Sequence, residues 1–425
     1  MNQIASQNAP SPKVVLPHYI FGGLVLLVVT MLIIYHPDAF VQHFFNPELL
    51  AITHLLVLGW ITMVIFGALY QLLPVIMEVK LYSEVLAKFS FVLLGVGTAL
   101  LAFAFWRFAF GFLMIIAGIL ITISVSLFVA NVLKTAYTSN KKIIERTFII
   151  SSTLWLMFTV LAGLTLAINL AWPFLKVSHV ELLKLHAHAG IAGWFIQLII
   201  GVSSKLLPMF MVAHNVNAKK LNYTFYAVNI GIATGIVSLF IQLKLGVVFS
   251  VGLVVSGIVA YLSFLVEAYI KRIKKQLDIG MKQTVLSFAL LVIPMFLIFL
   301  LLTNFNAMKR LSLPLSIAYG TTIIIGFITS LVMGQTYKTL PFIVWLKVYR
   351  GKVGRVILPL PKDLYSENVA LAQTWLFAIG FAILLLGVLI SAGKLVMTGG
   401  IVLSISVALY NFNILKIVFH KPKSK

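Results

Sequence analysis

Twelve stretches of this chain are each long and apolar enough to cross a lipid bilayer. A transmembrane helix needs roughly 20 consecutive apolar residues to span a hydrocarbon core of about 30 Å. Such segments lie at 17–36, 50–77, 86–106, 108–133, 147–170, 184–212, 223–242, 245–270, 284–304, 312–345, 370–391 and 394–418. Because 61% of the residues are hydrophobic and only 10% are charged, little chain is left for a soluble domain. The sequence therefore predicts an all-α polytopic membrane protein that forms a single transmembrane domain over residues 1–425.

The positive charge of the chain predicts its orientation in the membrane. The formal net charge is +22, and most Lys and Arg residues fall on the side of the N-terminus when the twelve segments are followed in order. Loops rich in Lys and Arg normally stay in the cytoplasm. We therefore expect an integral protein of the cytoplasmic (inner) membrane with both termini in the cytoplasm. Topology and contact with anionic lipid explain the charge, so nucleic acid is not expected as a partner.

The absence of cysteine limits the chemistry that the chain can perform. It excludes disulfides, iron–sulfur clusters held by its own thiolates, thioether-linked haem and thiolate copper centres. The sequence also contains no phosphate-binding glycine loop and no dinucleotide fingerprint. Any metal ion or haem would have to be bound by histidine, the strongest transition-metal ligand that remains.

Three stretches of the chain share one pattern. They read HLLVLGWITMVIFGALYQLLP from His54, HAGIAGWFIQLIIGVSSKLLP from His188 and TTIIIGFITSLVMGQTYKTLP from Thr321. Each has two glycines at the same spacing, an aromatic residue after the first glycine, and Leu-Pro at the end. The starts are 134 and 133 residues apart, which corresponds to four membrane helices. The sequence thus predicts three parallel four-helix units, near 17–133, 147–270 and 284–418, with pseudo-threefold symmetry and with the three stretches on inner helices.

The repeated glycines indicate close packing between helices. At about 100° per residue, Gly59, Gly67 and Pro74 lie within about 80° of one another on the helix surface. A face of small residues lets neighbouring membrane helices approach closely. His54 lies about 140° from Gly59 by the same estimate, so we expect its ring to point away from that face.

Three histidines lie within apolar segments and are candidate cofactor ligands. They are His54, His186 and His188. An ionisable group inside a membrane usually marks a functional site. His186 and His188 are two residues apart and project to different sides of one helix, so we do not expect them to bind the same metal ion.

Three further histidines fall in or beside loops on the same, outer side of the predicted topology. They are His36, His43 and His179. Six histidines on one side of the membrane suggest a metal or haem region, which makes these three candidate metal ligands. Histidines also settle at helix ends where one edge of the ring stays in contact with water, and the sequence leaves that alternative open.

The predicted plan resembles the catalytic subunit (subunit I) of the haem–copper oxidases, which has twelve helices in three parallel groups of four. The stretch THLLVLGWITMVIFGALYQLLP resembles the second helix of that family, whose histidine binds the low-spin haem. The resemblance implies that His54 is one axial ligand of a b-type haem and that His186 or His188 is the other. It also implies copper as a second candidate cofactor, and a redox partner or a second respiratory subunit.

Several parts of the oxidase pattern are missing. The third copy has Thr321 and Thr322 where the family has a His-x-His pair, and the segment at 223–242 contains no histidine for the copper site. The His-x-His pair of this chain lies instead on the sixth segment. A complete oxygen-reducing centre cannot be built from these residues. We therefore expect a redox protein without complete oxidase activity, an oxidoreductase of the respiratory haem–copper type if it is an enzyme.

Two other functions remain open at this stage. A transporter or channel could have kept the same scaffold without cofactors. No carboxylate falls in the middle of a predicted segment, which favours a neutral solute over an ion. A copper-handling or assembly factor for respiratory enzymes would use His36, His43 and His179 as an entry route for copper.

Overall fold

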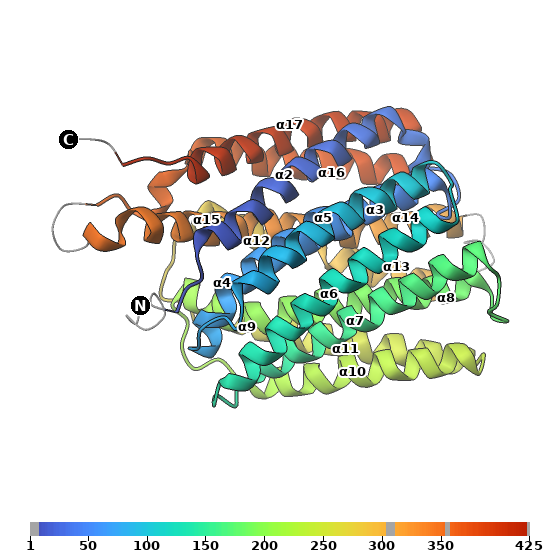
Figure 1. Ribbon diagram of the computed structural model, residues 1–425, viewed down its shortest axis with the longest axis horizontal. Helices are drawn as coiled ribbons and strands as arrows, with labels where there is room; N and C mark the ends of the chain where they lie inside the picture. Colours follow the sequence, from blue (N-terminus) through green and yellow to red (C-terminus); the bar gives the residue numbers. More distant parts are fainter. Residues whose placement is uncertain (1–7, 303–310, 353–357, 423–425) are drawn as a thin grey trace. The chain divides into compact units, whose positions relative to one another are not determined.

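The computed structural model describes residues 8–302, 311–352 and 358–422 (Figure 1). Over these residues it contains twelve helices that are long and apolar enough to cross a membrane, and no β-strand. The protein is thus an all-α polytopic membrane protein, as its sequence predicts, and a lipid bilayer is its environment.

The helices follow the predicted segments closely. The first six spans are α2 (Pro12–Tyr35), α3–η2–α4 (Pro47–His54, Leu55–Thr62, Met63–Met77), α5 (Glu84–Trp106), α6 (Phe112–Thr138), α7 (Ile144–Ala171) and α8–η3–α9 (His179–His188, Ala189–Ile196, Gln197–Met211). The last six are α10 (Lys219–Phe240), α11 (Lys244–Ile270), α12–α13 (Ile279–Leu290, Val292–Leu302), α14–η5–α15 (Ser312–Thr321, Thr322–Thr329, Ser330–Tyr349), α16 (Glu367–Leu389) and α17 (Gly393–Val418). Short 3-10 turns lie at Pro37–Phe40, Arg350–Lys352 and Pro361–Leu364.

Local capping explains where the helix ends differ from the prediction. α2 begins at Pro12 rather than at residue 17, because Ser11 accepts a hydrogen bond from the N–H of Lys13 and proline suits the first turn of a helix. α6 begins at Phe112 rather than at residue 108, because Phe108 has a positive φ of 51° and ends the preceding helical path.

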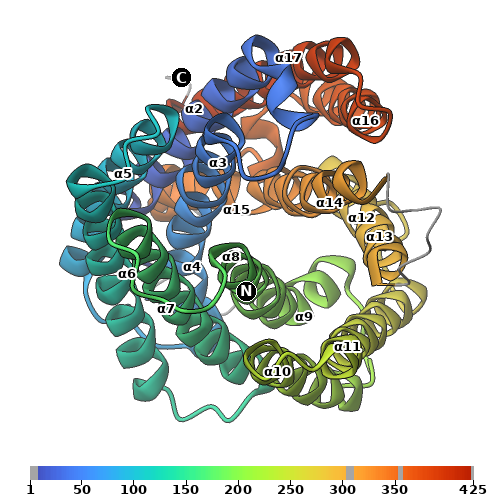
Figure 2. The same ribbon diagram turned by 90° about the vertical axis from the view of Figure 1, so that its right-hand side faces the viewer.

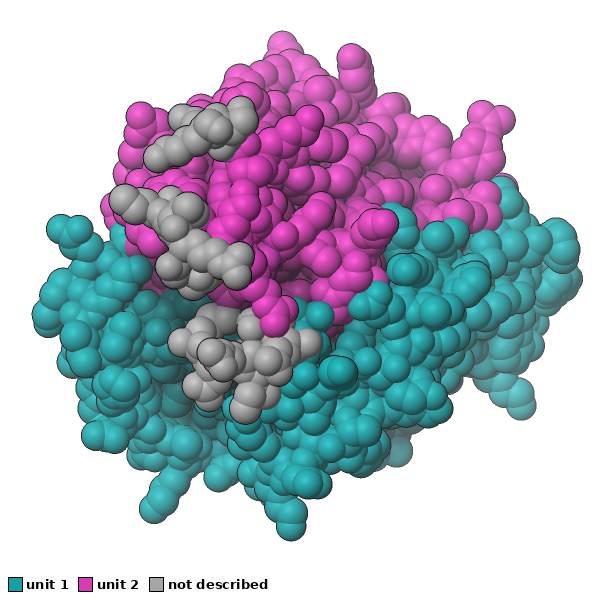
Figure 3. All heavy atoms as spheres, turned by 60° about the vertical axis from the view of Figure 1, so that its left-hand side comes forward, with its two compact units in different colours: residues 1–9, 72–93, 110–277 teal, residues 10–71, 94–109, 278–425 magenta. Residues whose placement is uncertain are grey.

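The chain divides into two compact units, which Figure 3 colours teal and magenta. Unit 1 comprises Met1–Ala9, Leu72–Leu93 and Phe110–Leu277, and unit 2 comprises Pro10–Gln71, Leu94–Ala109 and Asp278–Lys425. The arrangement of three four-helix units about a pseudo-threefold axis, and the single transmembrane domain, stay predictions.

Each unit is held together by helices packed side by side. In unit 1, α10 packs along α11, and α7 packs against α6, η3 and α9. In unit 2, α17 lies between α2 and α16, as the view along the helices in Figure 2 shows, and α12 packs against α15.

The three helices that carry the repeated pattern are the most buried of the twelve. In their most apolar windows, 61% of the residues of Pro47–Met77, 78% of His179–Met211 and 72% of Ser312–Lys352 are buried. The corresponding share is between 22% and 44% for each of the other nine. Most residues in these three windows are therefore buried within the protein, and the placement of the three stretches on inner helices stays a prediction.

The second glycine of each copy makes a close contact with another helix. In all three copies that helix is the one that opens the predicted four-helix unit: Gly67 lies against His18 of α2, Gly201 against Phe148 of α7 and Gly334 against Gly280 of α12. A Cβ on these glycines would come within 2.6, 2.6 and 2.9 Å of the neighbouring atoms. The prediction that small residues let neighbouring helices approach closely is therefore confirmed at these positions.

The substitution Gly201→Ala tests this packing. It should lower the free energy of unfolding by about 1–3 kcal/mol, because the new Cβ would overlap the Cβ of Phe148. Gly252→Ala is the matched control in α11, since a Cβ there meets no heavy atom within 4 Å. The control should be as stable as the wild type or slightly more stable. Thermal unfolding in one detergent compares the two, and equal midpoints would contradict the close contact.

Candidate functional site

Each of the three repeated stretches contains an eight-residue π-helical segment. The segments η2, η3 and η5 begin one residue after His54, His188 and Thr321, respectively. The backbone therefore repeats together with the sequence, at the same position in every copy. In η2 the N–H of Met63 bonds to the carbonyl of Leu58, five residues earlier, as π geometry requires. π-helical turns are rare and occur often at functional sites.

The π segments change where the repeated side chains point. The angle of about 140° between His54 and Gly59 assumes 3.6 residues per turn throughout. The residues after His54 belong instead to η2, where hydrogen bonds span five residues. A residue and the fifth one after it then lie more nearly above one another. The assumption of 3.6 residues per turn behind the predicted angle therefore does not hold in η2, because a composition that suits a membrane helix does not reveal a π turn.

His54, the last residue of α3, is held in one orientation by two contacts. Its Nδ1 donates a hydrogen bond to the carbonyl oxygen of Leu50 at 2.8 Å. Its ring stacks on Phe105 with 4.7 Å between the ring centroids and 27° between the planes. Because a carbonyl oxygen can only accept, Nδ1 carries the proton, and Nε2 carries the lone pair in the neutral ring. This is the state in which an imidazole binds a metal ion through Nε2.

His188 repeats this arrangement in the second copy. It is the last residue of α8, and its Nδ1 donates to the carbonyl oxygen of Lys184 at 2.8 Å. The two histidines thus occupy equivalent positions and make the same bond to the carbonyl four residues earlier. In the third copy, the hydroxyl of Thr322 donates to the carbonyl of Ala318 at 2.6 Å. That copy keeps the backbone of the other two and offers no imidazole.

His186 has different surroundings from His188, as their spacing predicts. Its Nδ1 donates to the carbonyl oxygen of Thr159 on α7 at 2.9 Å. A Cβ on Gly163 would lie 2.9 Å from Cε1 of His186. The lack of a side chain at Gly163 therefore leaves room for the imidazole ring against α7. The proton is again on Nδ1 and the lone pair on Nε2. His186 therefore shares the protonation state of His54 and His188, although its hydrogen-bond partner lies on another helix.

His43 and His179, two of the loop histidines, have the opposite tautomer. The Nδ1 of His43 accepts from the N–H of Phe45 at 3.1 Å. The Nδ1 of His179 accepts from the amide nitrogen of Asn169 at 3.4 Å. Neutral rings in these environments carry the proton on Nε2, which therefore cannot serve as a ligand without a change of partners. These two histidines thus differ in tautomer from His54, His186 and His188, whose Nδ1 atoms donate hydrogen bonds.

The predicted metal ligands do not form a cluster in the described part of the chain. Within residues 8–302, 311–352 and 358–422, no group of three or more His, Asp or Glu side chains could hold a metal ion. His36 packs edge-on against Trp106, with 4.7 Å between ring centroids, and is exposed. His36 and His43 belong to unit 2 and His179 to unit 1. Their role as metal ligands stays a prediction from sequence.

A partly buried polar cluster in unit 1 is a feature that the sequence did not predict. The Oδ1 of Asn229 on α10 accepts from Ser151 at 3.0 Å, from Trp155 at 2.9 Å and from Gln197 at 3.2 Å. Its Nδ2 donates to Gln197 at 3.1 Å and to the carbonyl of Phe225 at 2.9 Å. The cluster joins α7, α9 and α10. The only signal in the sequence is an Asn and a Gln inside apolar segments, which indicates hydrogen bonds between helices without naming the partners.

An ion pair at one end of unit 2 was also not predicted. The Nζ of Lys338 lies 2.7 Å from Oδ2 of Asp278, and the two side chains are only 16% and 18% exposed. Asp278 also caps α12, since its Oδ1 accepts from the N–H of Met281. The sequence places Asp278 in a loop and Lys338 sixty residues away, so their contact becomes visible only in the folded chain.

No protein-family model and no curated protein sequence matches this chain. The resemblance to the oxidase catalytic subunit therefore rests on the repeated pattern, on His54 and on the pair His186 and His188. The function has to be inferred from the geometry of these residues.

The polar cluster yields a stability prediction. Asn229→Leu should lower the free energy of unfolding by about 1–3 kcal/mol, because the partly buried donors of Ser151 and Trp155 and the buried donor of Gln197 lose their shared acceptor. Thr234→Val on the same helix is the control, since the hydroxyl of the partly exposed Thr234 bonds only to carbonyls of its own helix in the described contacts. Titration with SDS, followed by tryptophan fluorescence, measures both. A loss no larger than that of the control would mean that the cluster does not hold α7, α9 and α10 together.

Proposed function

We propose that this chain is an integral membrane redox protein that binds b-type haem through imidazole. It would be a divergent relative of the haem–copper oxidase catalytic subunit, without a complete oxygen-reducing centre. One observation carries the proposal: His54 and His188 sit directly before equivalent π segments, and each donates Nδ1–H to the carbonyl four residues earlier. A bond of this kind is the usual partner of an imidazole bound to a metal ion, and it makes Nε2 the ligating atom.

The available donors fit haem better than a bare metal ion. Protein-bound zinc or copper ions usually need three or four side-chain ligands, and the described residues contain no group of three that could supply them. A porphyrin brings four nitrogen donors of its own, so one or two imidazoles complete the coordination of its iron. Histidines that stand singly or in separated positions, such as His54 and His188, match that requirement.

The residues around His54 would fix the ligand and set its electronic character. The hydrogen bond to the Leu50 carbonyl holds the rotation of the imidazole and raises the basicity of Nε2. Phe105 covers one face of the ring, which keeps water away from that face. His186, held by the Thr159 carbonyl, offers an imidazole of the same chemical kind in unit 1. A bound haem supplies one-electron transfer.

Reduction of oxygen to water is not part of the proposal. Thr321 and Thr322 stand where the oxidase family has two histidines, and the Thr322 hydroxyl is bonded to its own helix. The sequence of α10 also contains no histidine for a copper ion. A chain of this composition could transfer or store electrons at haem, with copper as a less well supported second cofactor.

The location and the alternatives follow from the same observations. The basic loops support an inner-membrane protein with cytoplasmic termini, which would exchange electrons with a redox partner or a respiratory subunit.

A copper-handling assembly factor is a weaker alternative, because His43 and His179 accept hydrogen bonds at Nδ1. In a cofactor-free transporter or channel, the same bond would serve only to satisfy the Nδ1–H groups of His54 and His188.

The substitution His54→Ala tests the proposal. The purified wild type should show a b-type pyridine haemochrome and a low-spin absorption spectrum, and His54→Ala should lose the low-spin bands. His54→Met should keep haem and raise its midpoint potential, since thioether ligation raises the potential.

Two controls make the spectra decisive. The triple variant His36→Ala, His43→Ala and His179→Ala should keep the haem spectrum, because Nδ1 of His43 and of His179 accepts a hydrogen bond and His36 is exposed. Size-exclusion chromatography should show the same elution volume for every variant. A wild type that folds without haem would refute the proposal, and a full haem content in His54→Ala would refute the role of His54.

A further inference from the structure

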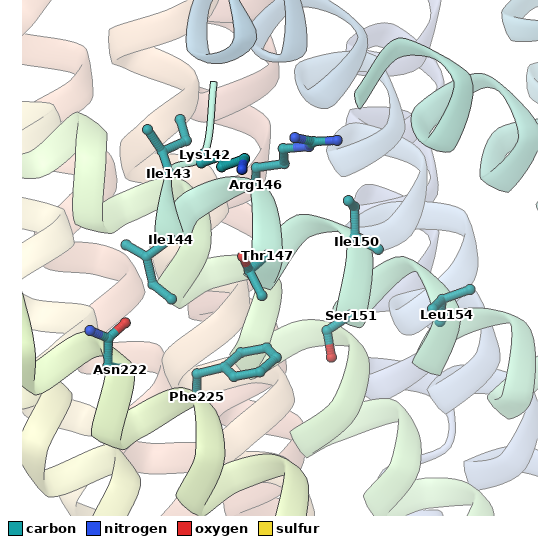
Figure 4. Close-up of a pocket in the computed structure, with 10 residues that line it drawn as sticks. All are labelled: Lys142, Ile143, Ile144, Arg146, Thr147, Ile150, Ser151, Leu154, Asn222 and Phe225. Atoms are coloured by element: carbon teal, nitrogen blue, oxygen red, sulfur yellow. The ribbon is translucent and has the colours of Figure 1, made fainter. Parts of the chain in front are cut away.

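A groove of about 550 Å³ runs along the surface of unit 1, between the beginning of α7 and the beginning of α10 (Figure 4). Residues from Lys142 to Leu154 form one wall, and Asn222 and Phe225 form the other. Between Ile144 and Leu154 the helix rises by about 15 Å. The groove therefore extends from the end of the helix into the membrane-spanning part of α7.

The end of the groove at the start of α7 is positively charged. Lys142 and Arg146 both line it. In the described part of the chain, Nη1 of Arg146 donates to the carbonyl of Lys141 at 3.3 Å, and its Nε has no hydrogen-bond partner. The nearby carboxylate of Glu78 is paired with Lys141 at 2.6 Å, so it does not neutralise the two lining residues. Glu145 is on the same turn as Arg146 but does not line the groove.

The next part of the groove is polar and uncharged. Thr147 on α7 and Asn222 on α10 line it, and both side chains are exposed. A hydroxyl and an amide can donate hydrogen bonds to ester carbonyl groups. Ser151, which lines the groove deeper along α7, is already bonded to Asn229.

The far part of the groove is apolar. Ile150 and Leu154 line it on α7, and Leu154 is 51% exposed within a membrane-spanning helix. Phe225 forms the opposite wall, and its ring packs edge-on against Phe148 with 5.3 Å between centroids. An exposed apolar wall in a membrane span faces acyl chains.

We propose that this groove binds an anionic phospholipid. The phosphate would lie at Lys142 and Arg146, the glycerol esters at Thr147 and Asn222, and an acyl chain along Leu154. Apart from Ile143 and Ile144 beside the charged end, the lining side chains are charged, then polar, then apolar along the groove, which is the order of phosphate, ester and acyl chain in a phospholipid. A free phosphate would match only the charged end, and a zwitterionic lipid would leave part of the positive charge uncompensated.

A bound lipid would contact α7 and α10 together. The Asn229 cluster already joins these helices deeper along the groove. A ligand that binds only the folded state stabilises it by an amount that rises with the logarithm of the ratio of its concentration to its Kd. Phosphatidylglycerol should therefore raise the unfolding temperature of the delipidated protein.

Titration of the delipidated wild type in detergent tests the proposal. The probes are phosphatidylglycerol, phosphatidylcholine with the same acyl chains, glycerol phosphate and inorganic phosphate. Native mass spectrometry measures the bound lipid, and thermal unfolding measures the stabilisation. Phosphatidylglycerol should bind more tightly than phosphatidylcholine, and the soluble phosphates should stabilise the protein little. Equal stabilisation by inorganic phosphate would overturn the proposal in favour of a free-anion site.

Matched variants locate the binding site. Lys142→Gln with Arg146→Gln should weaken phosphatidylglycerol binding by about thirtyfold, since two basic side chains near an anionic lipid are lost. Lys219→Gln with Lys275→Gln removes the same charge from two exposed positions and should keep the affinity. Leu154→Asn should weaken both lipids and leave the response to inorganic phosphate unchanged. Equal losses in the two double variants would overturn the proposal, because they would indicate general attraction to a basic surface.

The wild-type measurements decide the matter even if the Lys142 and Arg146 variant does not fold. A preference for phosphatidylglycerol over both phosphatidylcholine and glycerol phosphate supports a site that binds the anionic headgroup and the acyl chain of one lipid. No preference among these three probes would refute it.

Discussion

A backbone amide inside a bilayer has no water to bond with, so each N–H and C=O of a spanning segment must find its partner within a helix. Twelve helices with short connections satisfy this requirement in the described part of the chain. The same requirement explains why the repeated feature of the backbone is a π segment rather than a break. A π turn shifts the hydrogen bonds by one residue and leaves the carbonyl and amide groups paired, so it can change the direction of side chains at membrane depth.

Most of the fold could be predicted, because length and hydropathy act on each membrane segment separately. The span predicted at 245–270 is α11 (Lys244–Ile270), and the one at 394–418 is α17 (Gly393–Val418). The repeated spacing of Gly67, Gly201 and Gly334 also indicates close helix packing from the sequence alone, because only a small residue permits two helices to approach so closely. Errors occurred at the helix ends, where a cap such as Ser11 or a positive φ such as that of Phe108 decides the boundary.

The candidate site could be predicted less well, because its properties depend on contacts that sequence spacing does not contain. The histidines could be named from their positions, yet the tautomer of each ring depends on its neighbour. His54 donates to a carbonyl and His43 accepts from a backbone amide, although one histidine ends α3 and the other lies just before its start. The Asn229 cluster joins residues up to 78 positions apart in the sequence. Lys338 forms an ion pair with Asp278, which lies 60 positions away. Such pairs follow from the packing of whole helices.

The segment after Thr321 has the same π geometry as the segments after His54 and His188, although its copy has no histidine. The irregular turn is therefore a property of how these helices pack and does not require the ring that precedes it in the other copies. Within this one chain, a threonine at position 321 and histidines at positions 54 and 188 precede the same irregular backbone. The geometry of the turn and the chemical nature of the side chain before it are thus separate properties of the repeat.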